Sequence, residues 1–195
     1  QIVAVLTQPD RAAGRGLKQT KNPVKLFAEK AGLTLLDFES LDGENVFETI
    51  KKLSPDLLIT IAYGGLIPQK ILDIPRCESI NIHPSLLPLW RGASPIQSAI
   101  LNGDAKTGIS LIRMTPELDA GPIFAVTETS IDPEENTLTL SNRLANMSAI
   151  LMADNIEDIV NKNTFPNEQE HQKATYASKL TKQDAIINWT RPASE

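Results

Sequence analysis

Residues 57–83, LLITIAYGGLIPQKILDIPRCESINIH, contain the pattern that decides the fold. Residues 57–62 are a short apolar run, as expected for a buried strand, and residues 79–83 (SINIH) are a second such run that ends before Pro84. Between them we expect a glycine-containing loop and a short helix over residues 69–72. Strands and helices that alternate at this spacing predict an α/β fold with a doubly wound, mostly parallel sheet.

The same alternation continues on both sides of this stretch. Further strands are expected at residues 2–7, 33–38, 108–114 and 123–131, and further helices at residues 23–31, 44–53, 95–101 and 137–160. Thr137 is the expected N-cap of the long helix. Residues 8–22 are polar, basic and contain glycine, so we expect a long loop, and residues 165–173 are expected to form a polar surface connection.

Composition narrows the class of protein. The 195 residues are 41% hydrophobic and 22% charged, as in an ordinary globular domain, and aromatic residues are only 5%, so the core should be aliphatic. No apolar run is long enough to cross a bilayer. Cys77 is the only cysteine, which excludes an intrachain disulfide and fits a reducing cytoplasm.

The net charge of −5 argues against a nucleic-acid partner, but its distribution does not. The segment 10–25 holds five basic residues against Asp10 alone, a local charge of +4, which leaves −9 on the rest of the chain. A basic segment on an acidic body can recruit a polyanion to one place. The alternative is a solvated surface loop.

Two polar side chains at the end of a predicted strand are candidates for chemistry. Asn81 and His83 flank Ile82, so strand alternation places both on one face. An amide can donate to a developing oxyanion, and an imidazole can move a proton near neutral pH. A capping asparagine and a surface histidine would give the same pattern.

A carboxylate in a later turn is the third candidate. Asp119 lies in the tight turn Leu118-Asp-Ala-Gly121, where it could orient an imidazole or could simply bond its own backbone. Rival motifs are absent from the sequence, because it holds no P-loop, dinucleotide fingerprint, zinc motif or nucleophile elbow. Ligands of open α/β sheets bind outside the carboxyl ends of the strands, where these residues are expected.

The stretch 81–88 (NIHPSLLP) resembles the core motif of the 10-formyltetrahydrofolate-dependent formyltransferases, and Leu118-Asp-Ala-Gly121 resembles their second motif at matching spacing. The resemblance implies a Rossmann-like domain that, in this chain, lacks its first strand and helix. It implies Asn81, His83 and Asp119 as catalytic residues and no metal. The implied folate contacts are Tyr63, Ser85, Leu86, Leu87, Pro88 and Leu118.

Three stretches are similar to the family members that act on initiator methionyl-tRNA. Residues 7–16 (TQPDRAAGRG) resemble an insertion loop that reaches the RNA, which implies RNA contacts at Arg11, Arg15 and Lys18, with Arg15 the key arginine. Residues 90–97 (WRGASPIQ) resemble the corresponding stretch of those members. Residues 176–180 and 187–189 resemble their junction with an RNA-binding domain. Two positions depart from these members, since Pro84 and Leu89 replace their common glycine and basic residue.

These similarities imply a function and a division of the chain. We expect residues 1–178 to be an N-terminally incomplete catalytic domain, and residues 179–195 to be a linker and the start of a truncated tRNA-binding domain. The implied reaction formylates the methionyl α-amine for translation initiation, in a cytoplasmic monomer with no membrane partner. The alternatives are a formyltransferase acting on glycinamide ribonucleotide or an amino sugar, a formyltetrahydrofolate hydrolase, and a non-enzymatic folate- or RNA-binding module.

Overall fold

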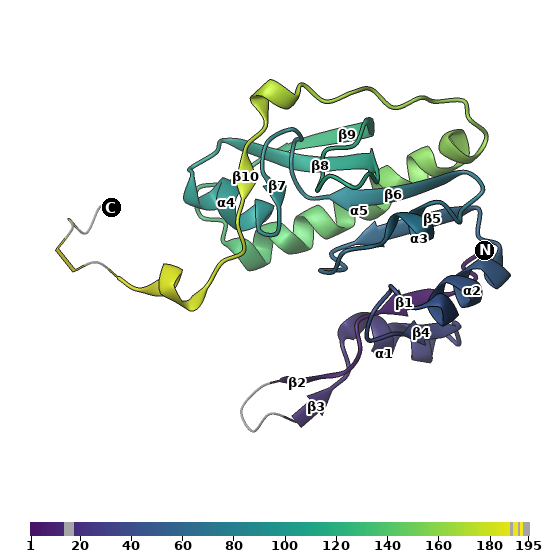
Figure 1. Cartoon of the computed structure of the whole chain (residues 1–195). Coiled ribbons are helices and arrows are strands. Elements are labelled where there is room, and N and C mark those ends of the chain that lie inside the picture. The colour runs from purple at the N-terminus through teal and green to yellow at the C-terminus, as the bar shows by residue number, and fades with distance from the viewer. Residues whose placement is uncertain (14–17, 188, 191, 193–195) are drawn as a thin grey trace.

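A four-stranded mixed sheet forms the centre of the computed structural model, which describes residues 1–195 except 14–17, 188, 191 and 193–195 (Figure 1). Its strands, in spatial order, are β5 (Leu57–Ile61), β6 (Glu78–His83), β8 (Lys106–Arg113) and β9 (Ile123–Ser130). β5 and β6 are parallel, whereas β8 runs antiparallel to both β6 and β9. Only residues 114–122 separate β8 from β9, and so short a connection cannot cross over to make a parallel pair. The predicted α/β class is confirmed.

Smaller sheets extend this architecture. β1 (Val5–Thr7) pairs in parallel with β4 (Leu35–Asp37), and this pair lies on the β5 side of the central sheet (Figure 1). Near the other end of the chain, β10 (Tyr176–Ala177) pairs in parallel with β7 (Arg91–Gly92). The second pairing ties the C-terminal part of the chain to the loop that follows β6.

A hairpin replaces the long loop expected over residues 8–22. β2 (Arg11–Ala13) and β3 (Lys18–Thr20) pair antiparallel and project away from the body of the protein (Figure 1). The expectation of a loop was wrong because neither strand carries the apolar alternation of a buried sheet. The pairing instead satisfies backbone groups at the surface.

The helices follow the predicted segments closely. They are α1 (Pro23–Lys30), α2 (Glu44–Leu53), α3 (Gln69–Leu72), α4 (Pro95–Leu101) and α5 (Thr137–Val160). Asn22 caps α1 by accepting a hydrogen bond from the Lys25 amide. The N-cap of α5 is Asn136 and not Thr137, because the Asn136 side chain accepts from the amides of Leu138 and Thr139 in a capping box.

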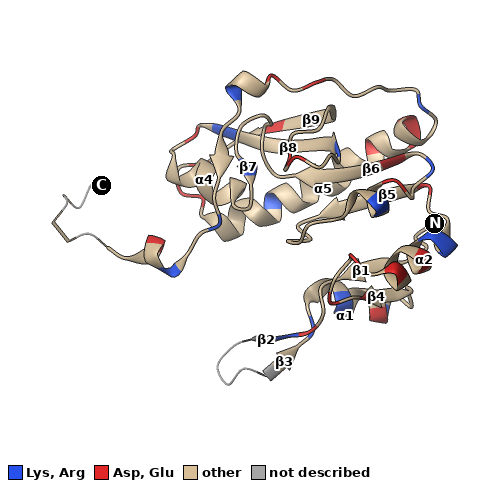
Figure 2. Cartoon of the chain, in the orientation of Figure 1, with Lys and Arg blue, Asp and Glu red and all other residues tan. Residues whose placement is uncertain are grey.

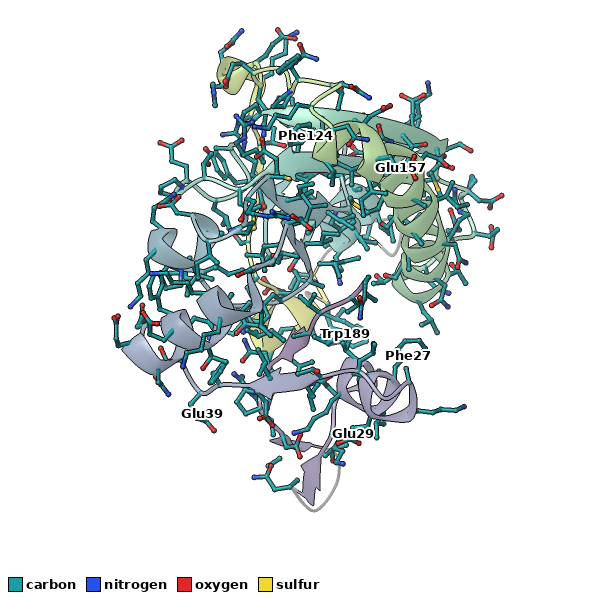
Figure 3. The ribbon with its side chains drawn as sticks, turned by 90° about the vertical axis from the view of Figure 1, so that its right-hand side faces the viewer. Phe27, Glu29, Glu39, Phe124, Glu157 and Trp189 are labelled. Carbon is teal, nitrogen blue, oxygen red and sulfur yellow. The ribbon has the colours of Figure 1, made fainter. Side chains whose placement is uncertain are left out.

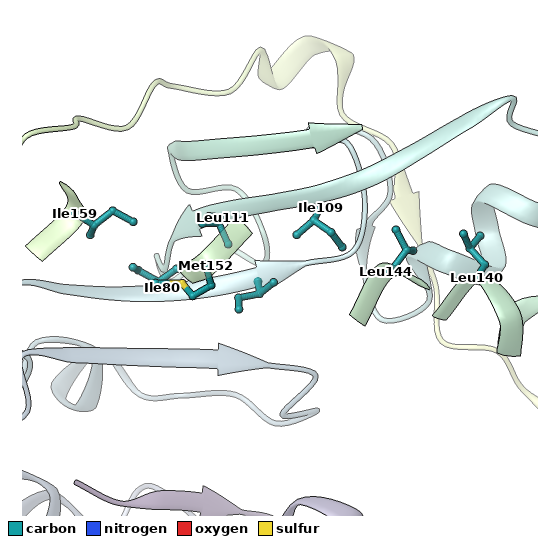
Figure 4. Packing of buried hydrophobic residues seen from close by; sticks show 8 residues of the cluster. Ile80, Ile109, Leu111, Leu140, Leu144, Met152 and Ile159 are labelled. Carbon is teal, nitrogen blue, oxygen red and sulfur yellow. The ribbon is translucent and has the colours of Figure 1, made fainter. Parts of the chain in front are cut away.

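The core is aliphatic, as predicted, and has two parts. The larger part lies between the central sheet and α5 (Figure 4), where its buried members are Ile80, Ile82, Ile109, Leu111, Leu140, Leu144, Met152 and Ile159. The smaller part lies around α2 and α3 and consists of Leu41, Val46, Ile50 and Ile71. Burying each such side chain contributes about 1.5–3 kcal/mol of hydrophobic free energy. The larger cluster therefore fixes the face of β6 that packs against α5.

Outside these clusters, some apolar side chains remain at the surface. Phe27 on α1 is one of them (Figure 3), and the exposed fraction of its surface is 68%. Beyond α5, residue Asn167 makes an isolated antiparallel bridge with Ile123, so this connection follows the edge of β9. Among the described residues, no helix is long and apolar enough to cross a membrane.

Candidate active site

Strand β6 carries two of the three candidate catalytic residues. Ile80 and Ile82 point into the larger core, so the alternating residues Asn81 and His83 face the opposite side of the sheet. His83 is 3% exposed and Asn81 is half-buried. The predicted shared face is therefore present, and the two side chains are held by a strand whose other face is packed.

Asp119 joins Asn81 and His83 to form one cluster. The Asn81 amide Nδ2 donates to Asp119 Oδ1 at 3.0 Å, and His83 Nδ1 lies 3.5 Å from Asp119 Oδ2. The Gly92 backbone N–H also donates to Oδ2, at 2.9 Å. An amide has two N–H donors, so Asn81 keeps one that bonds no other described residue. The structure brings the three predicted side chains together.

The turn that carries Asp119 has an unusual backbone. Asp119 has a φ of +51°, in the left-handed region that side chains rarely adopt. Two residues later, a Cβ added to Gly121 would come within 1.9 Å of the Arg113 carbonyl oxygen, so only glycine fits there. The turn is therefore shaped by its surroundings rather than by local preference.

The environment of His83 determines its charge. Burial lowers the pKa of His83 below its ordinary value, and the neighbouring Asp119 carboxylate opposes part of that decrease. His83 Nε2 lies 2.9 Å from the Trp90 carbonyl oxygen, so the Nε2–H tautomer donates to it. The neutral imidazole then presents the Nδ1 lone pair toward Asp119, where a proton could be held between the two side chains.

The loop after β6 is fixed by buried serines. The Ser110 hydroxyl on β8 donates to the Ser85 carbonyl at 2.8 Å and accepts from the Leu87 amide at 3.1 Å. The Ser85 hydroxyl, which is fully buried, donates to the Leu89 carbonyl at 2.6 Å. These bonds stabilise the loop from inside, and they use the hydroxyl and carbonyl of Ser85 and the amide of Leu87.

The other predicted contacts lie in different settings. Burial raises the pKa of Tyr63, which packs against the smaller core. Leu118 is 60% exposed beside Asp119, and Leu86 and Pro88 are half-buried. Of the predicted RNA contacts, Arg11 begins β2 and Lys18 begins β3, whereas Arg15 lies outside the described residues.

Sequence reasoning missed two buried polar side chains beside the cluster. Gln169 lies in the connection expected to be an exposed surface segment, yet it is 5% exposed and hydrogen-bonds the Asp119 and Gly121 carbonyls. Arg91, 4% exposed, donates to Gln169 and contacts His171 in the same connection. Nothing in a run of polar residues distinguishes a buried glutamine, so the sequence carried no signal for it.

Comparison with known proteins identifies the sequence family that this chain matches. The sequence model described as formyl transferase matches residues 1–156. Curated proteins named methionyl-tRNA formyltransferase are 42% identical over 98% of this chain in Thermotoga neapolitana and 44% identical over its full length in Pseudomonas fluorescens. This chain spans 61% of each of those proteins.

A solved structure shares the fold at low sequence identity. HypX from Aquifex aeolicus, in complex with tetrahydrofolic acid, superposes with a TM-score of 0.73 at 16% identity, over 100% of this chain and 33% of that one.

Proposed function

Because this chain belongs to the formyl transferase family, we propose that the full-length protein transfers a formyl group from 10-formyltetrahydrofolate to the α-amine of initiator methionyl-tRNA, for translation initiation. The observation that carries the proposal is the meeting of Asn81, His83 and Asp119 at the end of β6. Identities of 42% and 44% to methionyl-tRNA formyltransferases support the choice of acceptor.

The three side chains have separable roles in this reaction. When bound, 10-formyltetrahydrofolate supplies the formyl carbonyl that the neutral amine attacks. The remaining N–H of Asn81 would donate to the carbonyl oxygen, where negative charge develops, and such a donor is worth about 3–4 kcal/mol. His83, neutral near pH 7, would accept a proton as the amine loses it, and would return that proton to N10 of the folate as the bond between N10 and the formyl carbon breaks. Asp119 would hold Asn81 in place and stabilise the protonated imidazole.

The surroundings of the cluster fit a flat ligand with polar edges. Leu118 and Leu89 are 60% and 41% exposed on the two loops that meet at Asp119, so apolar surface is available beside the polar cluster. We assign the folate to these loops, with contacts from Tyr63, Ser85, Leu86, Leu87, Pro88 and Leu118. Neither loop is basic, so the folate and the RNA would bind through different parts of the chain.

The basic hairpin is our candidate for the RNA contact. β2 and β3 project from the body, and the segment 10–25 has a charge of +4 (Figure 2). We assign Arg11, Arg15 and Lys18 to the tRNA and residues 179–195 to the start of a second, RNA-binding domain. We further place the protein in the cytoplasm as a monomer, since one cysteine and a role in translation fit a reducing compartment.

The decisive test offers several acceptors to the purified full-length protein. With 10-formyltetrahydrofolate present, we expect formyl-methionyl-tRNA to form, and no comparable product from free methionine, glycinamide ribonucleotide or an amino sugar. Formate release without acceptor measures hydrolysis. If formate release or a small-amine product exceeds tRNA formylation at equal acceptor concentration, the proposed acceptor is wrong.

A further inference from the structure

The turn that carries Asp119 is held from behind by one buried side chain. The Gln169 amide Nε2 donates to the carbonyl oxygens of Asp119 and Gly121, at 2.9 and 2.7 Å. Both donors of this amide are therefore used on the two sides of Ala120. A single planar group that bonds two carbonyls of the same turn fixes the path of the backbone between them.

Gln169 is itself fixed by an arginine from another part of the chain. Its Oε1 accepts from Arg91 Nε at 3.1 Å and from Arg91 Nη2 at 2.7 Å. Nη2 also lies 3.0 Å from His171 Nδ1. Gln169 and Arg91 are about equally buried, at 5% and 4% exposure, so water does not compete for these bonds. We call this pair the Gln169–Arg91 clamp.

The clamp bonds the backbone of Asp119, and the candidate catalytic cluster contacts its carboxylate. Gly92 follows Arg91 in β7, and its N–H donates to the Asp119 carboxylate. The strand β7 thus reaches Asp119 twice, through Gly92 to the side chain and through the clamp to the backbone. Because the positive φ of Asp119 is a rarely populated conformation, the turn needs such external bonds to keep the carboxylate aimed at Asn81 and His83.

We propose that Gln169 is a positioning residue, which through its two bonds to the 119–121 turn keeps the Asp119 carboxylate in contact with Asn81 and His83. The kinetic part of this inference rests on the proposed formyl transfer. Gln169 lies outside residues 1–156, which the family model matches, and 50 residues from Asp119 in sequence. The polar connection after α5 is then part of the active-site framework.

The informative substitution is Gln169→Glu in the full-length protein. A glutamate still accepts from Arg91 but has no donor for the Asp119 and Gly121 carbonyls, and its second oxygen would repel them, so the two bonds to the turn are lost. We expect kcat to fall roughly 10- to 100-fold, the usual effect of displacing a catalytic group by about 1 Å, with both KM values within about twofold of wild type. Gln172→Glu is the matched control, because Gln172 is exposed three residues along the same segment.

A double substitution separates positioning from general support of the fold. If Gln169 acts through Asp119, then adding Gln169→Glu to an Asp119→Ala protein should change kcat by less than about twofold, because the group being positioned is already gone. An equal loss in both backgrounds, or a Gln169→Glu enzyme within about twofold of wild type, would overturn the inference.

A titration tests the clamp without any substrate. Asp119 is the charged neighbour that opposes the effect of burial on the pKa of His83. If the neutral variant Gln169→Met lets the turn move away, the pKa of His83 measured by NMR should fall below the wild-type value, whereas Gln172→Met should leave it unchanged. An unchanged pKa of His83 in Gln169→Met would contradict the clamp, whatever the activity of the protein. Failure of the wild-type protein to formylate tRNA would instead refute the proposed function and leave the result of the titration standing.

Discussion

At the residue scale, the site depends on the different partners that the two oxygens of one carboxylate bind. Asp119 Oδ1 accepts from Asn81, and Oδ2 accepts from Gly92 and lies near His83. The carboxylate therefore orients a neutral donor and faces a titratable ring at the same time. Removing it would release both partners, whereas removing either partner leaves the carboxylate still bonded to Gly92.

Substitution of either β6 side chain should reduce turnover and spare the fold. We expect Asn81→Ala and His83→Ala to lower kcat by roughly 100-fold or more, since each removes a group that acts on the carbonyl or the amine in the proposed reaction. Circular dichroism and a thermal melt check that the fold is intact. Asn45→Ala, which changes an exposed asparagine on α2, is the control. Near-normal kcat in either folded variant would show that the residue is not catalytic.

The pH dependence of activity should report His83. Because burial lowers its folded pKa, the ring is neutral at pH 7 and gains a proton only below its ordinary value near 6.5. If neutral His83 accepts the proton, kcat/KM divided by the fraction of methionyl-tRNA whose α-amine is neutral at each pH should fall on the acid side, with a midpoint below about 6.5. Asp119→Asn removes the charge that opposes the effect of burial, so the pKa of His83 measured by NMR should fall further. A rate that instead rises as the pH falls through the pKa of His83 would indicate that protonated His83 is the active form.

At the scale of elements, sequence patterns correctly predicted the helices that have one apolar face. The predicted bounds of α2 and α5 match the structure, because their apolar residues recur at helical spacing toward a core. The β2–β3 hairpin and the burial of Gln169 were missed for the opposite reason. The hairpin residues whose side chains are described, Arg11, Ala12, Gln19 and Thr20, are exposed, and Gln169 is bonded to Arg91, which lies 78 residues away in sequence. The juxtaposition of Asn81 and His83 followed from alternation, but their contact with Asp119 depends on how β8 leads into the 119–121 turn.

The base of the hairpin is anchored by a single lysine. Lys25 on α1 is 8% exposed, and its Nζ lies 2.9 Å from Asp10 Oδ1, just before β2, and 2.6 Å from Asp37 Oδ2, at the end of β4. The hydrogen bond to Asp10, followed by that to Asp37, raises the pKa of Lys25, and Lys25 lowers the pKa of Asp37. Besides the covalent chain, the ion pairs of Lys25 with Asp10 and Asp37 therefore connect the hairpin to the body of the protein.

Removing that lysine should disturb RNA use more than folate use. In Lys25→Met two carboxylates face each other without a cation, so we expect the KM for methionyl-tRNA to rise severalfold and the KM for the folate to stay unchanged. Adding Asp37→Asn should restore part of the loss, because it removes the repulsion. Lys30→Met, an exposed lysine of the same helix, serves as the control. Equal KM values for tRNA in the Lys25 and Lys30 variants would mean that the anchor does not position the hairpin.

At the scale of the whole molecule, the charge is divided unevenly. The chain has a net charge of −5, and the +4 segment 10–25 stands against −9 elsewhere. Within this chain, an acidic body repels RNA at long range, so the attraction that the chain itself contributes must come from a local basic surface, and salt screens both effects. A change at the hairpin should therefore act differently from the same change in charge placed elsewhere on the chain.

Paired substitutions with equal charge test whether recruitment is local. Arg11→Ala with Lys18→Ala removes two positive charges from the hairpin, and Lys51→Ala with Lys52→Ala removes two from the end of α2. Each phosphate contact contributes about 0.7–0.9 to the slope of log affinity against log salt, so the hairpin pair should lower kcat/KM for methionyl-tRNA and flatten its salt dependence by roughly one to two units. The α2 pair should leave that slope unchanged, and the folate Kd should be the same in both proteins. If the two pairs reduce tRNA use equally, net charge alone governs recruitment and the hairpin makes no phosphate contact.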